Sequence, residues 1–526
     1  MQPHARILIL DFGSQYTQLI VRRLRELSVY SEIVPCDIPF NEIIKFNPKG
    51  LIFSGGPYSV YEKKAPALFS PQKTLALNIP ILGICYGMQY LTQICGGKVV
   101  PAKICEYGRT FIEKKNFGQS EILPIFKEKC PVWMSHGDEI GRLPEGFKLT
   151  AISANNSPAV MENFLKKYYA VQFHPEVTHT ENGNEIFKRF LFEVCKLKPN
   201  WNLNLYLEEK IESIRNQVQK KNVICALSGG VDSTVAAALV HQAIGSKLKC
   251  IFVNNGLLRK NEAKEVLETY KKHLKFNLLY VDAERQFLKA LQGIQDAEKK
   301  RKIIGREFIQ IFERHSKKLN ATHLVQGTLY PDVIESKPPP RDRLGKSQKV
   351  GFSFTIKSHH NVGGLPAQLK LKLIEPFREL FKDEVRELGK TLQVPSSILE
   401  RHPFPGPGLA VRILGEVTKQ KLKILQEADA VFLDELKQFG LYHKVWQAFA
   451  VFLPIHSVGV MGDSRTYENV VALRAVTSVD GMTADWVSFP PEFLTRVSSR
   501  ITGEIKGINR VVYDVSSKPP ATIEWE

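Results

Sequence analysis

The chain has 526 residues, enough for about three domains of roughly 150 residues each. Its 43% hydrophobic and 24% charged residues are typical of a folded globular protein with sizeable cores. No apolar run approaches the roughly 18 residues of a membrane-spanning helix, and no signal-peptide pattern opens the chain. We therefore expect a cytoplasmic protein without a membrane partner.

The net charge of +18 raises the question of a nucleic-acid partner. The basic residues are dispersed and accompany no nucleic-acid motif, so we expect no such partner. Steering of polyphosphate substrates and a lysine-rich solvated surface both remain open as explanations. The eight cysteines form no CxxC pair and no zinc spacing, so neither disulfides nor structural zinc is expected.

Apolar runs alternate with helical patterns over residues 1–198, which we take as the first domain. Buried-strand patterns occupy residues 6–11, 51–53 and 81–85, and helices are expected over residues 16–27 and 65–77. This alternation predicts an α/β fold with a doubly wound, flavodoxin-like parallel sheet.

The third of these strands runs into the sequence Gly83-Ile-Cys85-Tyr-Gly87. Glycines on both sides of a nucleophile are typical of a strained strand-to-helix elbow, and the helix N-terminus there favours a thiolate. His174 and Glu176 end a later strand two residues apart, so both side chains can point the same way. A lone buried cysteine or a lone strand-end histidine is usually structural, but together they favour a nucleophile with its base.

In this order the motifs Asp-Phe-Gly-Ser-Gln-Tyr, Ser-Gly-Gly-Pro, the cysteine elbow, Ser-His-Gly-Asp and His-Pro-Glu resemble a class I glutamine amidotransferase. The resemblance implies that Cys85 attacks the glutamine amide, that His174 shuttles the proton and that Glu176 orients His174. A γ-glutamyl thioester and ammonia would follow. Further expected contacts, to the oxyanion or the glutamine head group, involve Gly56, Tyr86, Gln89, Ser135 and His136. The Ser-His-Gly-Asp segment has the alternative of serving only as a turn.

A second domain is expected over residues 204–400, after a break at residues 199–202. Its central feature is a strand over residues 223–227 followed by a glycine-rich turn and a small-residue helix. Adjacent glycines let main-chain N–H groups approach a phosphate, and the helix N-terminus favours the anion. The turn consists of Ser228, Gly229, Gly230, Val231, Asp232, Ser233 and Thr234.

Asp232 stands where a Walker A loop would need a lysine, so a kinase-type loop is excluded. The turn instead resembles the loop of the ATP pyrophosphatase (PP-loop) superfamily, which implies cleavage of ATP between its α and β phosphates. We expect Mg²⁺ with the ATP, with Asp232 as the one candidate ligand, and no organic cofactor. Strands over residues 248–253, 277–282 and 322–327 predict a second doubly wound parallel sheet.

Three features of this second domain carry open interpretations. Asn254 stands where the family usually has Asp, which puts an acidic role there in doubt. Residues 337–355 are basic and Pro-rich and fit either a lid over the nucleotide or a surface insertion. Residues 356–364 contain a His pair, for which phosphate contact and hinge motion are favoured over a structural turn or a metal site.

Residues 401–412 are too rich in Pro and Gly for a helix or a central strand and predict a stiff connection. A small α+β domain is expected over residues 401–526, with a helix over 419–439, a strand over 509–515 and a tail held by prolines. The motifs of both later domains resemble the GMP synthetase family along nearly their full length. The resemblance implies a dimerisation domain, hence a homodimer, and a tail that binds xanthosine monophosphate (XMP). The implied XMP contacts are Arg301, Asp463, Lys518, Thr522 and Glu524.

The resemblance implies a ligase that uses ATP, XMP and L-glutamine. ATP would adenylate O2 of XMP, and ammonia from the Cys85 site would displace AMP to give GMP. A synthetase making NAD or asparagine is the nearest rival, but the Lys-Pro-Pro-Ala-Thr-Ile-Glu-Trp-Glu tail and the absence of their amidase types argue against it. A tRNA-thiolating enzyme would need sulfur-handling cysteines. A basic RNA-binding protein would require salt-dependent RNA retention.

Overall fold

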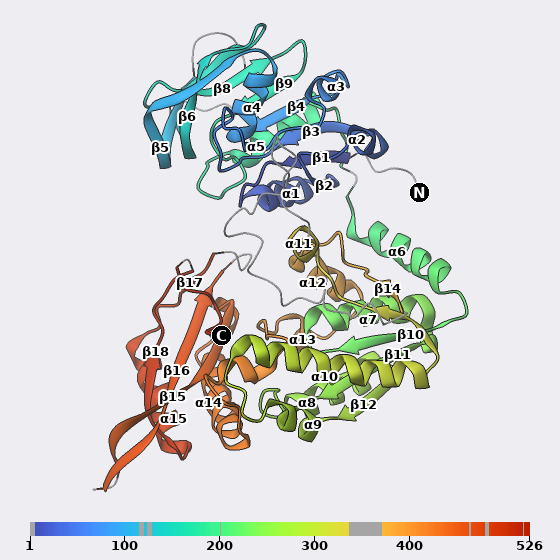
Figure 1. The fold of residues 1–526 in the computed structure, drawn as a ribbon, viewed down its shortest axis with the longest axis vertical. Coiled ribbons are helices and arrows are strands. Elements are labelled where there is room, and N and C mark those ends of the chain that lie inside the picture. Colours follow the sequence, from blue (N-terminus) through green and yellow to red (C-terminus); the bar gives the residue numbers. More distant parts are fainter. Residues whose placement is uncertain are drawn as a thin grey trace. The chain divides into compact units, whose positions relative to one another are not determined.

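The structure is a computed structural model of the chain (Figure 1). It describes residues 6–114, 120–123, 129–199, 201–335, 371–461, 464–478, 483–518 and 520–526. The chain divides into two compact units, the first over Met1–Asn202 and the second over Leu203–Val333 together with the C-terminal part to Glu526. Within the described residues, no helix combines the length and the apolar character needed to cross a bilayer.

A nine-stranded sheet forms the first unit, in the order β2-β1-β3-β4-β9-β8-β7-β5-β6. Its strands are β1 (Arg6–Asp11), β2 (Ser31–Pro35), β3 (Pro48–Phe53), β4 (Ile81–Ile84), β5 (Lys98–Lys114), β6 (Lys129–Arg142), β7 (Lys148–Ser153), β8 (Pro158–Asn163) and β9 (Tyr168–Val171). The five strands from β2 to β9 pair in parallel, which confirms the predicted doubly wound sheet. The four strands β8, β7, β5 and β6 extend it with antiparallel pairs that the strand–helix alternation did not reveal.

Helices follow several of these strands because the parallel strands need crossovers. They are α1 (Thr17–Glu26), α2 (Phe40–Phe46), α3 (Pro71–Leu75), α4 (Tyr86–Ile94), α5 (Gly183–Lys188) and the π-helical η1 (Arg189–Val194). The helix expected over residues 65–77 is shorter than predicted. Ser70 precedes Pro71 and is held extended, at φ −139° and ψ 77°, because a residue before proline disfavours the helical region.

The second unit contains a five-stranded parallel sheet in the order β12-β11-β10-β13-β14, as predicted. Its strands are β10 (Asn222–Leu227), β11 (Leu248–Asn254), β12 (Leu278–Asp282), β13 (Ala321–Val325) and β14 (Lys372–Ile374). The neighbours of β10 are β11 on one side and β13 on the other, so the strand order reverses there. Ligands of open α/β sheets bind at such a point, beyond the carboxyl ends of the strands.

Helices and short turns connect these strands. They are α6 (Leu203–Val218), α7 (Val231–Ile244), η2 (Gly245–Lys247), α8 (Glu262–Thr269), the π-helical η3 (Tyr270–Leu274), α9 (Glu284–Leu291), α10 (Ala297–Lys318), α11 (Tyr330–Glu335), α12 (Lys382–Thr391) and α13 (Ser396–Leu399). The helix expected to begin at residue 235 begins at Val231, so it takes in the second half of the predicted phosphate loop.

The C-terminal part of the second unit is α+β, as predicted. It contains η4 (Gly408–Arg412), α14 (Lys419–Gln438), η5 (Tyr442–Lys444), β15 (Gln447–Met461), β16 (Ser464–Thr477), β17 (Asp485–Trp486), α15 (Pro491–Glu504) and β18 (Ile508–Tyr513). The long β15–β16 pair is antiparallel, and β18 joins β16 in parallel. One continuous apolar core includes Ile251 of β11, Phe432 of α14 and Phe452 of β15, so this part belongs to the same compact unit as the parallel sheet.

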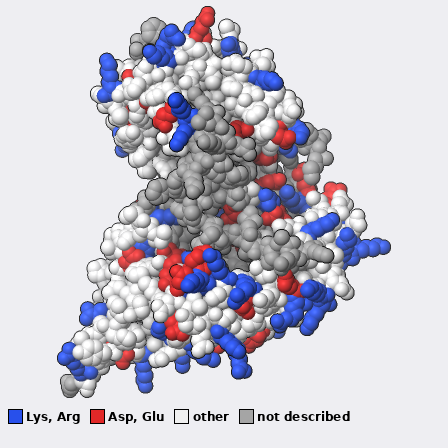
Figure 2. All heavy atoms as spheres, in the orientation of Figure 1, with Lys and Arg blue, Asp and Glu red and all other residues white. Residues whose placement is uncertain are grey.

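Charged side chains of both signs are interspersed over the described surface of the face drawn in Figure 2. This dispersion agrees with the sequence, in which the basic residues form no nucleic-acid motif.

Candidate active sites

Cys85 occupies a strained turn between β4 and α4 in the first unit. Its backbone has φ 52° and ψ −108°, which is unusual for a residue with a side chain and typical of a nucleophile elbow. The flanking glycines are needed for space. A Cβ on Gly83 would lie 2.7 Å from the carbonyl oxygen of Gly87, and one on Gly87 would lie 2.2 Å from that of Phe53.

His174 reaches the elbow because β9 lies beside β4 in the sheet. Nδ1 of His174 lies 2.7 Å from Oε1 of Glu176, and both side chains are almost fully buried. The ring of Tyr16 packs edge-on against that of His174, with centroids 5.1 Å apart. The structure thus brings all three predicted catalytic residues to one edge of the sheet.

The electrostatics of His174 favour its charged form. Burial alone would lower the pKa of His174, but the carboxylate of Glu176 and the sulfur of Cys85 raise it, and the result lies well above the usual value. An imidazolium beside the sulfur stabilises a thiolate, the nucleophilic form of cysteine.

The Gly55–Gly56 turn lies close against the same site. A Cβ on Gly55 would lie 3.1 Å from Cε1 of His174, and one on Gly56 would lie 2.7 Å from the carbonyl oxygen of Phe12 and 3.2 Å from the ring of Tyr86. Tyr86 is the first residue of α4, where main-chain N–H groups have no partner within the helix. This is the arrangement that an oxyanion hole of main-chain donors requires.

The other predicted glutamine contacts make hydrogen bonds within the protein. The main-chain oxygen of Ser135 lies 3.5 Å from the sulfur of Cys85. Buried His136 engages both ring nitrogens, with Glu106 at 3.0 Å and the carbonyl of Asp138 at 3.0 Å. The amide of Gln89 donates to the same Asp138 carbonyl at 3.1 Å. Gln89 and His136 therefore hold the Ser-His-Gly-Asp turn, which presents Ser135 to the cysteine.

In the second unit the phosphate loop connects β10 to α7. Gly229 has φ +80°, a left-handed conformation suited to glycine, and Gly230 is the N-cap of α7. The hydroxyls of Ser228 and Ser233 lie 3.0 Å apart, and that of Thr234 contacts both the carbonyl of Gly230 and Tyr270. Main-chain N–H groups and hydroxyls thus gather at one helix N-terminus.

Asp232 faces this loop with one carboxylate oxygen, Oδ1, that is buried and has no hydrogen-bond partner. Its other oxygen lies 3.5 Å from the ammonium of Lys382. No group of three His, Cys, Asp or Glu within the described residues could hold a metal ion. A single carboxylate with an unpaired oxygen fits Mg²⁺ that is held mainly by phosphates and water.

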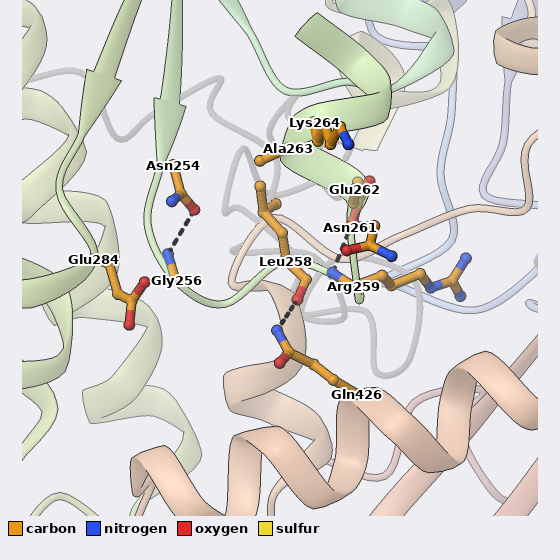
Figure 3. A pocket seen from close by; sticks show the side chains of 10 residues that line it. All are labelled: Asn254, Gly256, Leu258, Arg259, Asn261, Glu262, Ala263, Lys264, Glu284 and Gln426. Carbon is orange, nitrogen blue, oxygen red and sulfur yellow. Dashed lines mark hydrogen bonds between the residues drawn. The ribbon is translucent and has the colours of Figure 1, made fainter. Parts of the chain in front are cut away.

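A cavity of about 230 Å³ opens beside the loop, between the end of β11, the start of α8 and α14 (Figure 3). It is lined by Asn254, Gly256, Leu258, Arg259, Asn261, Glu262, Ala263, Lys264, Glu284 and Gln426. Asn254, the departure from the family's Asp, accepts a hydrogen bond from the N–H of Gly256 at 3.1 Å. Asn254 therefore shapes the turn after β11, a role that its amide oxygen fills without a charge.

The C-terminal tail is held by buried cations. Arg412, whose side chain is fully buried, makes a two-point contact with Glu524 at 2.8 and 3.1 Å. Gln447 also donates to Glu524, at 2.7 Å. The ammonium of Lys300 lies 2.6 Å from Glu526, and Arg301 donates to the main-chain oxygen of Glu526. The tail thus brings Glu524 and Arg301, two predicted XMP residues, onto one surface.

The remaining predicted nucleotide residues are placed less directly. Lys518 pairs with Ala484 through its main chain, and the hydroxyl of Thr522 donates to the carbonyl of Glu524. Asp463, the predicted lid over residues 337–355 and the His pair of residues 356–364 lie outside the described residues. Sequence reasoning missed Arg401, Arg412 and Lys300, because nothing in their local sequence marks them as partners of the loop or the tail.

Three family models match the chain. The model "Glutamine amidotransferase class-I" matches residues 8–194, "Thiamine biosynthesis protein (ThiI)" residues 218–333 and "GMP synthase C terminal domain" residues 434–525. With the elbow, the His–Glu pair and the phosphate loop, these matches define a class I glutamine amidotransferase joined to a PP-loop synthetase.

Curated relatives match over the whole length. GMP synthases [glutamine-hydrolyzing] are 55% identical in Carboxydothermus hydrogenoformans, over 99% of this chain and 100% of that one, and 57% identical in Aquifex aeolicus, over 99% of each. The protein of Brachyspira hyodysenteriae, with the same name, is 56% identical over 99% of each chain. The chain belongs to the family of glutamine-hydrolysing GMP synthases.

Proposed function

We propose that this chain makes GMP from XMP, with ATP as the activating nucleotide and glutamine as the nitrogen donor. The observation that carries the proposal is the buried His174–Glu176 pair beside the strained Cys85 elbow, in a chain whose full length matches GMP synthases. These nucleotides are substrates of the cell interior, so we expect the protein to act in the cytoplasm.

In the first unit, Cys85 attacks the amide carbon of glutamine while the main-chain N–H groups of Tyr86 and Gly56 stabilise the oxyanion. His174, charged through its contacts with Glu176 and Cys85, donates the proton to the leaving ammonia. A γ-glutamyl thioester on Cys85 remains, and His174 then activates the water that hydrolyses it to glutamate.

In the second unit, the loop from Ser228 to Thr234 binds the polyphosphate of ATP through main-chain N–H groups and hydroxyls. Mg²⁺ bound with the ATP neutralises phosphate charge, and Asp232 would help to hold it. O2 of XMP attacks the α phosphorus and pyrophosphate leaves, which turns a poor leaving group on the purine into AMP. Ammonia then displaces AMP to give GMP.

The tail supplies the XMP site in this proposal. Lys518, Thr522, Arg301 and Glu524 contact the nucleotide, with Arg412 and Gln447 holding the Glu524 carboxylate in place. Asp463 is proposed near the same nucleotide.

We further propose a homodimer through the C-terminal sheet. Several of its large apolar side chains are exposed, namely Ile455, Val458, Val460 and Tyr467. Contiguous exposed apolar side chains favour an interface, and a second copy of the chain is the partner that we assign. Light scattering on the purified protein should give twice the mass of the 59.6 kDa chain, and Val460→Glu should shift it toward the monomer.

The test of the function is pyrophosphate release from Mg-ATP, with ammonium and then glutamine as the nitrogen source. Release should depend on XMP and should match GMP formation one to one. If XMP elicits no release while another acceptor does, the loop chemistry stands and the XMP assignment is lost. Salt-dependent RNA retention without any pyrophosphate release would instead favour the RNA-binding alternative.

A further inference from the structure

The guanidinium of Arg401 contacts the main chain of the phosphate loop. Its Nη1 donates to the carbonyl oxygen of Gly229 at 2.9 Å. The same nitrogen lies 3.2 Å from Oε1 of Glu262, at the start of α8. Residue 401 is 172 positions from the loop in sequence, so this contact exists only in the folded unit.

Glu262 is held in place from its other side. Its side chain is only 6% exposed, and its second oxygen accepts the main-chain N–H of Arg259 at 2.9 Å. Both oxygens of a buried carboxylate are therefore engaged, which fixes its orientation. Arg401, with its side chain 22% exposed, is thus aimed at the loop by a rigid anion.

Holding the Gly229 carbonyl also fixes a donor of the loop. In a trans peptide the C=O of one residue and the N–H of the next point in opposite directions. With the Gly229 oxygen turned to Arg401, the Gly230 N–H is turned the other way, toward the hydroxyl of Ser228 at 3.3 Å. Gly229 at φ +80° lacks the steric restriction of other residues, so its peptide needs an external hold.

We propose that Arg401, oriented by Glu262, is a positioning residue that holds the Gly229 peptide so that the loop presents its N–H groups to the phosphates of ATP. This inference rests on the proposed function, in which the loop binds ATP. Arg401 acts through the main chain of Gly229 and contacts no reacting atom.

The test measures binding of Mg²⁺ with α,β-methylene ATP by calorimetry in the full-length protein. Arg401→Ala should weaken binding about tenfold or more, since a hydrogen bond from a charged donor is lost. Glu262→Gln should weaken it less, because the amide oxygen can still accept from Arg401. In steady-state assays with ammonium, the KM for Mg-ATP should rise while glutaminase activity stays unchanged.

Arg215→Met is the matched control. Arg215 also donates from its guanidinium to a main-chain carbonyl, that of Ala243 at 3.0 Å, but at the opposite end of α7. Its substitution should leave nucleotide affinity within about twofold. Added guanidinium ion should partly restore binding to Arg401→Ala and leave the wild type unaffected, which a general loss of stability would not produce.

The outcomes separate the inference from the proposed function. A wild-type protein that binds no ATP analogue would overturn the function. A wild type that binds, with Arg401→Ala binding equally well, overturns the positioning role alone. An unchanged affinity in Glu262→Gln together with full affinity in Arg401→Lys would make Arg401 a direct phosphate contact, and would also overturn it. If Arg401→Ala does not fold, Arg401→Lys and Glu262→Gln decide by the same measurement.

Discussion

The main-chain N–H of Cys85 donates to the carbonyl of Val171 at 2.8 Å, which anchors the nucleophile to the strand that leads to His174. Adjacent parallel strands end at the same edge of the sheet, so this hydrogen bond sets the distance between thiol and base. The predictions below follow from this and related contacts.

Cys85→Ala should abolish the glutamine-dependent reaction and spare the ammonium-dependent one. Loss of the nucleophile should lower glutamine-dependent GMP formation about 10⁴-fold or more. Cys130→Ala, which removes another buried thiol of the same unit, is the control and should keep both activities. Equal loss of both activities in Cys85→Ala would place the cysteine outside a dedicated amidotransferase site.

Stability should fall as the pH rises through the pKa of His174. That pKa is raised in the folded protein, mainly by Glu176 and Cys85 against the opposing effect of burial. The folded state therefore binds more protons than the unfolded state above the unfolded value of about 6.5. The stabilisation is fully present below pH 6.5, by this estimate roughly, and is lost as pH rises through the higher folded pKa. Denaturant titrations of the first unit across this range should show the slope, and Glu176→Gln should reduce it.

Gly87→Ala should destabilise the first unit strongly. An added Cβ would lie 2.2 Å from the main-chain oxygen of Phe53, which cannot move without shifting β3. We expect a loss of more than about 3 kcal/mol in the free energy of unfolding, at the upper end for overpacking. Gly305→Ala is the contrast, since it lies within α10 with nothing within 4 Å of an added Cβ, and it should stabilise by about 0.5–1 kcal/mol.

Glu524→Gln should weaken the anchoring of the tail. The change removes a charged partner of fully buried Arg412, and we expect a loss of about 1.5–3 kcal/mol in the free energy of unfolding of the second unit. The KM for XMP should rise as well. Glu504→Gln breaks an exposed pair with Arg500 and should change stability by less than about 0.5 kcal/mol. An unchanged KM for XMP in Glu524→Gln would argue against a tail-borne XMP site.

Much of the fold could be predicted because its signals are local. The apolar runs that became β1, β4, β10 and β11 read directly as buried parallel strands. The antiparallel strands β5 and β6 were missed, since β5 alternates exposed and half-buried residues with little apolar periodicity. The apolar run of β4 and the glycines around Cys85 likewise predicted a strained elbow, which the backbone angles of Cys85 match.

The sequence by itself determined the chemistry that depends on short spacings: the cysteine between glycines, the His174–Glu176 pair on one strand, and the glycine-rich turn at a helix N-terminus. Only the tertiary structure decided which distant groups hold those motifs. His136 and Gln89 fix a turn, Arg412 holds the tail, and Arg401 reaches the phosphate loop. Contacts between segments more than a hundred residues apart leave no local pattern, because they depend on how the strands and connections pack.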